Sequence, residues 1–241
     1  MSTQAVILAL IQALTEFLPI SSSAHLFLTE KLFHLSFDLS FDVFIHFGSA
    51  LALIVYFAKE WPALLKERPL SSSLIFKLFL ALIPAAVLGI VLEKTQPSFW
   101  RITSLTLFNL IFFGLILIWA DQKAGEKTAK QLTLTEALLI GLAQALALFP
   151  GVSRSGITIS VALFLGLKRK EAAKFSFLLA TPAILGATLL EAPKIISLNH
   201  SFLVPYLIGF LASFAFSYLV VAWLLRYLEP VSYTHLTLPT N

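Results

Sequence analysis

Five long apolar runs, separated by polar breaks, follow one another along this chain of 241 residues. Each has about the 20 mostly apolar residues that a helix needs to cross the hydrocarbon core of a bilayer. We therefore predict five transmembrane helices, at Phe41–Ala58, Leu74–Leu92, Thr103–Ala120, Ala172–Leu190 and Phe202–Leu225. The fold class that this pattern predicts is an all-α, polytopic membrane protein.

Four further apolar segments are too short to cross a bilayer comfortably. They are followed by proline and serine rather than by charged loops, which favours segments that enter the membrane and turn back inside it. We predict two re-entrant helical hairpins, built from Ala5–Leu18 with Leu26–Leu35 and from Leu134–Phe149 with Ile157–Leu167.

The two predicted hairpins carry the same segment twice. Residues 10–25 read LIQALTEFLPISSSAH and residues 142–157 read LAQALALFPGVSRSGI, so Gln12 aligns with Gln144 and Ser21 with Ser153 at a separation of 132 positions. A second pair, ALIPAAVLGIVLE at 81–93 and LATPAILGATLLE at 179–191, follows with one residue of slippage. Duplicated, proline-broken segments in a membrane protein indicate a site where two repeats meet. The repeats run from about 5 to 93 and from about 134 to 228.

The composition supports the membrane assignment and excludes other classes of protein. Hydrophobic residues make up 58% of the chain and charged residues 12%, against about a quarter charged in soluble domains. The absence of cysteine excludes disulfides and thiolate metal sites. The net charge of +4 resides in short loops between spans, so we expect no nucleic-acid partner.

The basic loops predict an orientation in the membrane. If the first three spans each cross once, one side holds six basic residues and the other holds only Lys94 and Arg101. The six are Lys59, Lys66, Arg68, Lys123, Lys127 and Lys130. The positive-inside rule places them in the cytoplasm. With residues 134–167 returning to their starting side, the two halves enter from opposite faces, which predicts inverted-topology repeats.

The last eleven residues differ in composition from the rest of the chain. The segment 231–241, VSYTHLTLPTN, is polar, follows Glu229-Pro230 and is too short to form a span. We expect a single transmembrane domain over residues 1–230. We interpret 231–241 as an atypical tail, suggestive of a truncated chain with foreign residues appended.

The first copy of the repeated segment carries an acid, serines and a histidine. Glu16 lies one helical turn after Gln12, and a carboxylate inside a membrane is costly unless it is paired, hydrated or bound to a metal. The alternative is a glutamate in water at a helix end, and Gln12 can equally be a structural amide between helices. One of the three serines Ser21, Ser22 and Ser23 fits a helix cap, which also makes an anion site. His25, in the first turn of that helix, is a candidate acid–base group or an interfacial histidine.

The second copy has the composition of a phosphate cradle. Gly151 permits close backbone approach, Arg154 offers a planar fork suited to phosphate oxygens, and Ser153 and Ser155 flank it, with Thr158 following. A snorkelling interfacial arginine is the alternative for Arg154. Within the predicted span from Phe41 to Ala58, His46 either lines the site or bonds to a neighbouring helix, and we favour the second interpretation.

QALTEFLPISSSAH followed by PGVSRSGIT resembles the undecaprenyl-diphosphate phosphatase family of bacteria, of the bacitracin-resistance type. FDVFIHFGS, LIPAAVLG and FSFLLATPAILGAT occur in family-like order, and the resemblance covers about Ala5 to Leu228. It implies a multi-pass enzyme of the inner (plasma) membrane that hydrolyses the C55 isoprenyl diphosphate to the monophosphate and recycles the lipid carrier of cell-wall synthesis. It further implies a divalent cation and an active site that opens to the outer face.

The resemblance carries over residue by residue. The family's paired acidic positions fall on Gln12 and Glu16, which implies that Mg²⁺ or Ca²⁺ is held mainly by Glu16. The serine–histidine motif falls on Ser21, Ser22 and His25, although Ser23-Ala24 stand where many members have Thr-Gly. The Pro-Gly-x-Ser-Arg-Ser loop is intact and supplies Ser153, Arg154 and Ser155. The family's final transmembrane helix is replaced by the tail.

These observations together predict a composite site for a diphosphate between the two serine-rich turns. Arg154 and the cradle of Gly151, Ser153, Ser155 and Thr158 would bind phosphate oxygens. Ser22 or a water would attack the terminal phosphorus while His25 manages the proton. The expected partners are the isoprenyl diphosphate lipid and the bilayer, with a homodimer left open. The rival function is a transporter or flippase of a phosphorylated lipid, because inverted repeats with broken helices are common in transporters.

Overall fold

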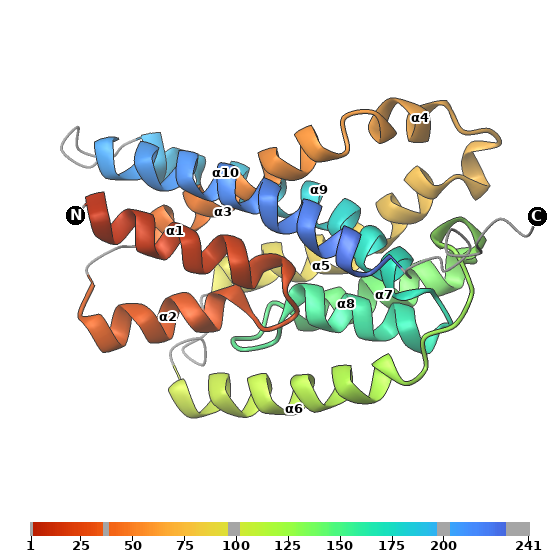
Figure 1. The fold of residues 1–241 in the computed structure, drawn as a ribbon, viewed down its shortest axis with the longest axis horizontal. Helices are drawn as coiled ribbons and strands as arrows, with labels where there is room; N and C mark the ends of the chain where they lie inside the picture. The colour runs from red at the N-terminus through yellow and green to blue at the C-terminus, as the bar shows by residue number, and fades with distance from the viewer. Residues whose placement is uncertain (1, 36–38, 96–101, 197–202, 230–241) are drawn as a thin grey trace, which may run out of the picture.

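The structure, a computed structural model, describes residues 2–35, 39–95, 102–196 and 203–229. Within these residues the chain forms ten α-helices and no strand (Figure 1). They are α1 (Ser2–Phe17), α2 (Ser22–Phe33), α3 (Leu39–Tyr56), α4 (Glu60–Lys66), α5 (Leu74–Thr95), α6 (Thr103–Asp121), α7 (Leu134–Leu146), α8 (Arg154–Phe164), α9 (Arg169–Ile196) and α10 (Leu203–Tyr227). The all-α prediction is confirmed. The atypical tail lies outside the described residues.

Five helices are long and apolar enough to span a membrane, and they are the five that the sequence predicts. The membrane-length segments are Leu39–Tyr56, Leu74–Leu92, Thr103–Asp121, Arg169–Pro193 and Leu203–Tyr227. Apolar runs of this length become helices because lipid offers no partner for backbone N–H and C=O groups, which a helix pairs within itself. Pro84 and Pro182 lie inside α5 and α9 without ending them.

The four shorter helices form two hairpins, α1 with α2 and α7 with α8. The first helix of each hairpin packs along the last helix of the other half, so α1 lies along α10 and α7 along α5 (Figure 1). This reciprocal pairing is what a duplication with a pseudo-two-fold axis produces. The entry of the halves from opposite membrane faces stays a prediction.

The basic loops that the charge pattern assigns to one side lie together at one end of the molecule. Ion pairs join them in the structure: Glu60 with Lys174, Glu67 with Lys130, Asp121 with Arg169, Lys127 with Glu136, and Lys170 with Glu229. The α4 helix marks this end in Figure 1, and the start of α1 lies at the opposite end.

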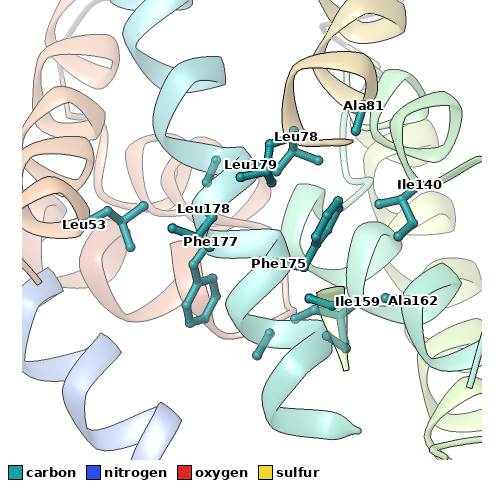
Figure 2. Close-up of a cluster of buried hydrophobic side chains, with 14 of the residues drawn as sticks. Leu53, Leu78, Ala81, Ile140, Ile159, Ala162, Phe175, Phe177, Leu178 and Leu179 are labelled. Atoms are coloured by element: carbon teal, nitrogen blue, oxygen red, sulfur yellow. The ribbon is translucent and has the colours of Figure 1, made fainter. Parts of the chain in front are cut away.

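Helix α9 is the centre of the core. Its side chains Phe175, Phe177, Leu178 and Leu179 are fully buried, and they lie among side chains of α3, α5, α7 and α8 (Figure 2). Gly141 of α7 allows a close backbone approach, because a Cβ there would lie 2.3 Å from the carbonyl oxygen of Ala81 in α5. Small residues at such contacts are typical of helices packed in membranes. The core therefore holds both hairpins against α9.

Candidate active site

The segment that joins α1 to α2, which we call the first tip (residues 16–25), begins in the last turn of α1, which ends at Phe17. Ser21 has a positive φ of 70° and forms no side-chain cap, while Ser22 begins α2. A positive φ in a residue other than glycine is strained and is found preferentially at functional sites. The conformation aims the start of α2 back toward the end of α1.

The turn between α7 and α8, the second tip (residues 147–155), is held by glycine, a cap and a neighbouring helix. Gly151 has a φ of 83°, and a Cβ there would lie 2.1 Å from the Thr106 carbonyl oxygen in α6. Asn109 Nδ2 donates to the Pro150 carbonyl at 2.8 Å. Ser153 caps α8 by accepting a hydrogen bond from Gly156 N at 3.1 Å. These contacts position Arg154, the first residue of α8.

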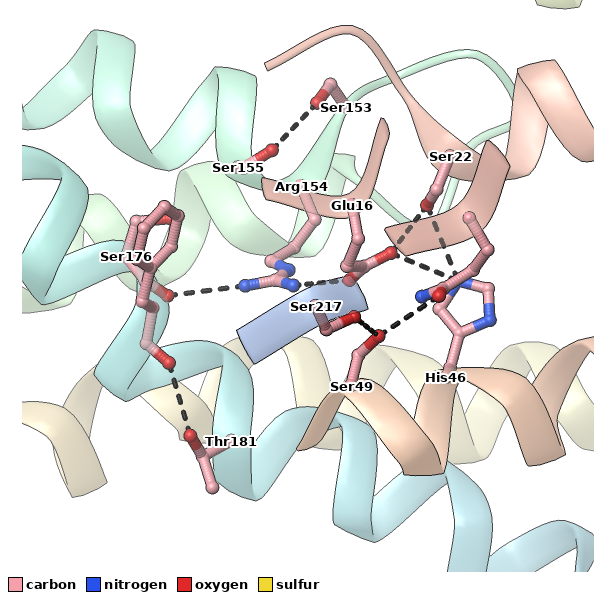
Figure 3. Close-up of polar contacts among 12 residues, drawn as sticks. Glu16, Ser22, His46, Ser49, Ser153, Arg154, Ser155, Ser176, Thr181 and Ser217 are labelled. Carbon is pink, nitrogen blue, oxygen red and sulfur yellow. Dashed lines mark hydrogen bonds and ion pairs between the residues drawn. The ribbon is translucent and has the colours of Figure 1, made fainter. Parts of the chain in front are cut away.

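The two tips meet, although 138 residues separate the side chains that join them (Figure 3). Arg154 Nη2 donates to Glu16 Oε1 at 2.5 Å, and Ser22 Oγ donates to Glu16 Oε2 at 2.6 Å. Glu16 is 7% exposed, so the pair is largely withdrawn from solvent. The predicted meeting of the tips is confirmed, and Arg154 is paired inside the protein rather than snorkelling.

His46 of α3 completes this cluster. Its Nε2 lies 3.1 Å from Glu16 Oε2 and 3.4 Å from Ser22 Oγ, and its Nδ1 lies 2.6 Å from the Asp42 carbonyl oxygen. Because a carbonyl can only accept, Nδ1 carries a hydrogen, which leaves Nε2 facing Glu16 and Ser22. His46 therefore contacts neighbouring helices, as we favoured, and it also lines the site, which was the other interpretation. The polar stripe of Asp42, His46 and Ser49, spaced along one face of α3, was the signal in the sequence.

The structure places His25 away from Glu16. Its Nδ1 lies 2.8 Å from the Ser21 carbonyl oxygen, and the ring lines a second cavity of about 300 Å³ on the α6 side of the tips. Gly151 lines this second cavity too, and Ser153 borders both cavities. The acid–base role implied by resemblance therefore lacks the geometry that His46 has.

Gln12 points into a buried polar cluster rather than into the site. Its Oε1 accepts hydrogen bonds from Ser49 Oγ at 3.0 Å and Ser213 Oγ at 2.8 Å, and Ser217 lies 2.6 Å from Ser49. The cluster joins α1, α3 and α10 beside Glu16. The amide oxygen that would bind a cation is thus already used.

The remaining predicted site residues divide into lining and supporting groups. Ser21, Ser153 and Ser155 line a pocket of about 330 Å³ together with Glu16, Ser22, His46 and Arg154. Thr158 lies behind it: its Oγ1 donates to the Arg154 carbonyl at 2.8 Å and lies 2.7 Å from Ser176 Oγ. The Ser176 carbonyl accepts from Arg154 Nη1 at 3.3 Å. Thr158 and Ser176 therefore support the arginine from the α9 side.

The protein groups do not form a complete cation site. A group of three or more His, Cys, Asp or Glu side chains arranged to hold a metal ion is absent from the part of the chain that the structure describes. Both oxygens of Glu16 have partners, namely Arg154 on one side and Ser22 with His46 on the other. Mg²⁺ usually keeps several waters and binds through one or two carboxylates, but the Glu16 oxygens are already paired, so the side chains as arranged do not form a cation site.

Comparisons with known proteins show to which family the chain is similar. The family model described as bacitracin resistance protein BacA matches residues 5–237. A protein of Elusimicrobium minutum named undecaprenyl-diphosphatase is 42% identical over 236 residues, which cover 95% of this chain and 90% of the relative. Proteins with the same name from Thermodesulfovibrio yellowstonii (42% identical, covering 94% and 88%) and Pelotomaculum thermopropionicum (40%, covering 95% and 89%) are similar over the same extent. The chain therefore belongs to the bacitracin resistance protein BacA family.

Proposed function

We propose that this protein hydrolyses undecaprenyl diphosphate to undecaprenyl phosphate and inorganic phosphate. The observation that carries the proposal is the buried meeting of Glu16, Ser22 and Arg154 from two distant hairpins in one pocket. The names of the relatives supply the substrate. Such a pocket combines an anion-binding group with a base and a hydroxyl, which hydrolysis of a phosphoanhydride requires.

Arg154 acts as the phosphate clamp in this proposal. A guanidinium carries five N–H donors in a planar fork, and the contacts with Glu16 and Ser176 use two of them. Arg154 is also the first residue of α8, where the backbone N–H groups and the helix dipole favour an anion. The guanidinium and the helix N-terminus stabilise the charge that spreads over the equatorial oxygens during phosphoryl transfer.

Glu16 acts as the base. The Ser22 hydroxyl already donates to Glu16 Oε2 at 2.6 Å, so the carboxylate is placed to take a proton from Ser22 or from a water in its place. Attack on the terminal phosphorus breaks its bond to the bridging oxygen, and undecaprenyl phosphate leaves. If Ser22 attacks, water then hydrolyses the phosphoserine. Either route consumes one water and releases one phosphate.

His46 is the proton donor to the leaving oxygen in this scheme, in place of His25. Its Nε2 faces Glu16 and Ser22, whereas the His25 ring lies in the other cavity. We also propose that hydrolysis requires Mg²⁺ or Ca²⁺. Phosphate release measured with and without EDTA tests this requirement. Because the described side chains do not complete a cation site, we assign no step to the ion.

We further propose that the site opens to the outer face of the bacterial inner membrane. The pocket extends from Glu16 to Leu39, at the beginning of α3, and to Ala187, in the second half of α9. These positions lie away from the basic loops at the end of α3 and the beginning of α9. The positive-inside rule assigns those loops to the cytoplasm.

Release of inorganic phosphate from undecaprenyl diphosphate by purified protein in detergent tests the function. We expect one phosphate per lipid, with the Glu16→Gln variant inactive and the Glu126→Gln variant normal, because Glu126 is an exposed loop residue. A transporter or flippase would release no phosphate. Absence of release by folded wild-type protein, with and without added Mg²⁺ or Ca²⁺, would overturn the proposal.

A further inference from the structure

Helices α8 and α9 meet at a pair of buried hydroxyl groups behind the pocket. Thr158 of α8 and Ser176 of α9 are each 1% exposed, and their hydroxyl oxygens lie 2.7 Å apart. Neither side chain lines the pocket of about 330 Å³ that contains Glu16 and Arg154. Thr158 is therefore set back from the place where we predicted it to bind phosphate, and the hydroxyl pair needs another explanation.

The hydrogen atoms of this pair have one consistent arrangement. Thr158 Oγ1 donates to the Arg154 carbonyl at 2.8 Å, and the Ser155 carbonyl lies 3.2 Å from it. A hydroxyl has a single hydrogen and a carbonyl can only accept, so Thr158 is the acceptor toward Ser176. Ser176 Oγ then donates to Thr158, and Thr158 donates to the backbone of Arg154. Two hydrogen bonds in series therefore join α9 to the first residue of α8.

Ser176 also contacts the other end of the same arginine. Its backbone carbonyl accepts a hydrogen bond from Arg154 Nη1 at 3.3 Å, while Arg154 Nη2 donates to Glu16 (Figure 3). The backbone and the guanidinium of Arg154 are thus both connected to one residue of α9. An arginine side chain has considerable rotamer entropy, so attachment at both ends restricts it more than either contact alone.

The first half of the protein has apolar side chains at the corresponding positions. At the repeat separation of 132 residues, Thr158 corresponds to Leu26 and Ser176 to Phe44. The packing of the repeated helices can therefore be achieved without hydroxyl groups. Because the hydroxyl pair stands in the copy that carries Arg154, its presence follows the arginine rather than the helix packing.

We propose that Ser176 is a positioning residue for the phosphate clamp, an inference that rests on the proposed function. It acts through Arg154 and does not touch the substrate. During phosphoryl transfer the guanidinium must present its planar fork to oxygens on which charge is developing. Ser176 fixes this orientation through its carbonyl and through Thr158. A misplaced guanidinium keeps its charge, so substrate binding should persist while the chemical step slows.

Substitutions that remove one hydroxyl at a time test this role. We expect Ser176→Ala to lower kcat about fivefold or more and Thr158→Val about tenfold or more, because small misplacements of catalytic groups are costly. The KM for undecaprenyl diphosphate should change less than about twofold in both variants, since the charge of Arg154 stays in the pocket. Thr158→Ser keeps the hydroxyl and should restore most of kcat.

The matched control is Ser160→Ala. Ser160 is fully buried on the same helix as Thr158, and its hydroxyl donates to the Gly156 carbonyl at 2.7 Å. It therefore loses a buried hydroxyl of the same kind without a contact to Arg154 or Ser176. We expect this variant to keep the kcat and KM of the wild type.

A stability cycle tests the two hydrogen bonds without the reaction. Because Ser176 and Thr158 share a hydrogen bond, the double variant Ser176→Ala/Thr158→Val should lose less stability than the sum of the single changes. Ser176→Ala combined with Ser160→Ala should give additive losses, because these hydroxyls bond to different partners. Denaturant unfolding in detergent measures both combinations.

The outcomes separate this inference from a purely structural pair and from the proposed function. Equal kcat values for Ser176→Ala and Ser160→Ala would overturn the positioning role. A change confined to KM in Thr158→Val would also overturn it and would assign Thr158 to substrate binding. Additive stability losses for Ser176→Ala and Thr158→Val would overturn the hydrogen bond between them. Failure of folded wild-type protein to release phosphate would overturn the function, and the stability cycle would in that case still test the link from α9 to α8.

Discussion

The first and second tips are copies of one segment, yet they contribute different chemistry to the site. At the separation of 132 residues, Glu16 corresponds to Leu148, Ser22 to Arg154 and His25 to Ile157. In the proposed mechanism, the base and the hydroxyl therefore come from one copy and the phosphate clamp from the other. Duplication provides two turns that meet at one pocket, and divergence at a few positions makes their meeting place asymmetric, as a reaction with distinct attacking and leaving groups requires.

The tips also differ in how the fold supports them. Helix α8 buries eight of its 11 residues, and Gly151, Asn109 and the Ser153 cap fix the turn before it. Helix α2 buries only Ala24 and Leu26 of its 12 residues, and Ser21 has no side-chain cap. The clamp is thus held rigidly, while the tip that carries Ser22 has fewer packing constraints.

Removal of the clamp should have the largest effect. We expect Arg154→Ala to lower kcat for phosphate release at least about a thousandfold, as for arginines that stabilise phosphoryl transfer, and Arg154→Lys to be nearly as poor because the planar fork is lost. Stability should fall by roughly 1–3 kcal/mol, since a buried Glu16 loses one partner but keeps Ser22 and His46. Phosphate release and detergent-phase unfolding measure the two effects.

The control for the clamp is Arg169→Ala. Arg169 also pairs with an acid, Asp121, but both side chains are half exposed, so the loss should be below about 1 kcal/mol and activity normal. Near-normal turnover of Arg154→Ala would contradict the assignment of the second tip as a phosphate clamp.

Two histidine substitutions separate the geometry from the family resemblance. We expect His46→Gln to lower kcat about a hundredfold, in the range for a general acid or base, and His25→Gln to lower it less than about fivefold. The reason is that His46 Nε2 contacts Glu16, whereas His25 contacts the Ser21 carbonyl on the other side of the tip. A larger loss of kcat for His25→Gln than for His46→Gln would assign proton transfer to His25 instead.

The histidines also show where sequence reasoning succeeds and where it ends. Apolar run length predicts the five spans because the bilayer demands about 20 residues of helix, and the repeated motif predicts that the tips meet. The direction of the side chains that follow this strained turn depends on the φ of 70° at Ser21, and no local sequence pattern predicts that angle. The turn directs Ser22 to Glu16 and His25 elsewhere, while His46 reaches the site from a different helix.

Backbone substitutions test the difference in support between the tips. Gly151→Ala should destabilise the protein by at least about 2 kcal/mol, because left-handed strain alone costs roughly 1–2 kcal/mol and the added Cβ would lie 2.1 Å from the Thr106 oxygen. Ser21→Gly should be neutral or stabilising, because glycine adopts a positive φ without strain. Denaturant titration in detergent measures both. Equal tolerance of the two changes would mean that the second tip is no more rigid than the first.

The smallest expected effect concerns the glutamines that precede both tips. Gln12 and Gln144 are equivalent in the repeat and nearly fully buried. Gln12 accepts hydrogen bonds from Ser49 and Ser213, whereas neither side-chain polar atom of Gln144 has a hydrogen-bond partner among the described residues. Gln12→Met should therefore cost about 1 kcal/mol, because it removes one acceptor of Ser49 and of Ser213, which keep only their contacts with each other, with Ser217 and with the Ile45 carbonyl. Gln144→Met should be neutral or stabilising, because it removes a buried amide and keeps the volume.

Unfolding of the two glutamine variants in the same detergent, with phosphate release measured in parallel, tests this pair. We expect Gln12→Met to lose activity only to the extent that α1 shifts against α3 and α10. Because Gln12 and Ser213 share a hydrogen bond, adding Ser213→Ala to Gln12→Met should cost less stability than the sum of the two single changes. Additive losses would show that Gln12 and Ser213 act independently. Equal losses for Gln12→Met and Gln144→Met would show that the two halves use the repeated glutamine in the same way, and that the asymmetry of the molecule is confined to the tips.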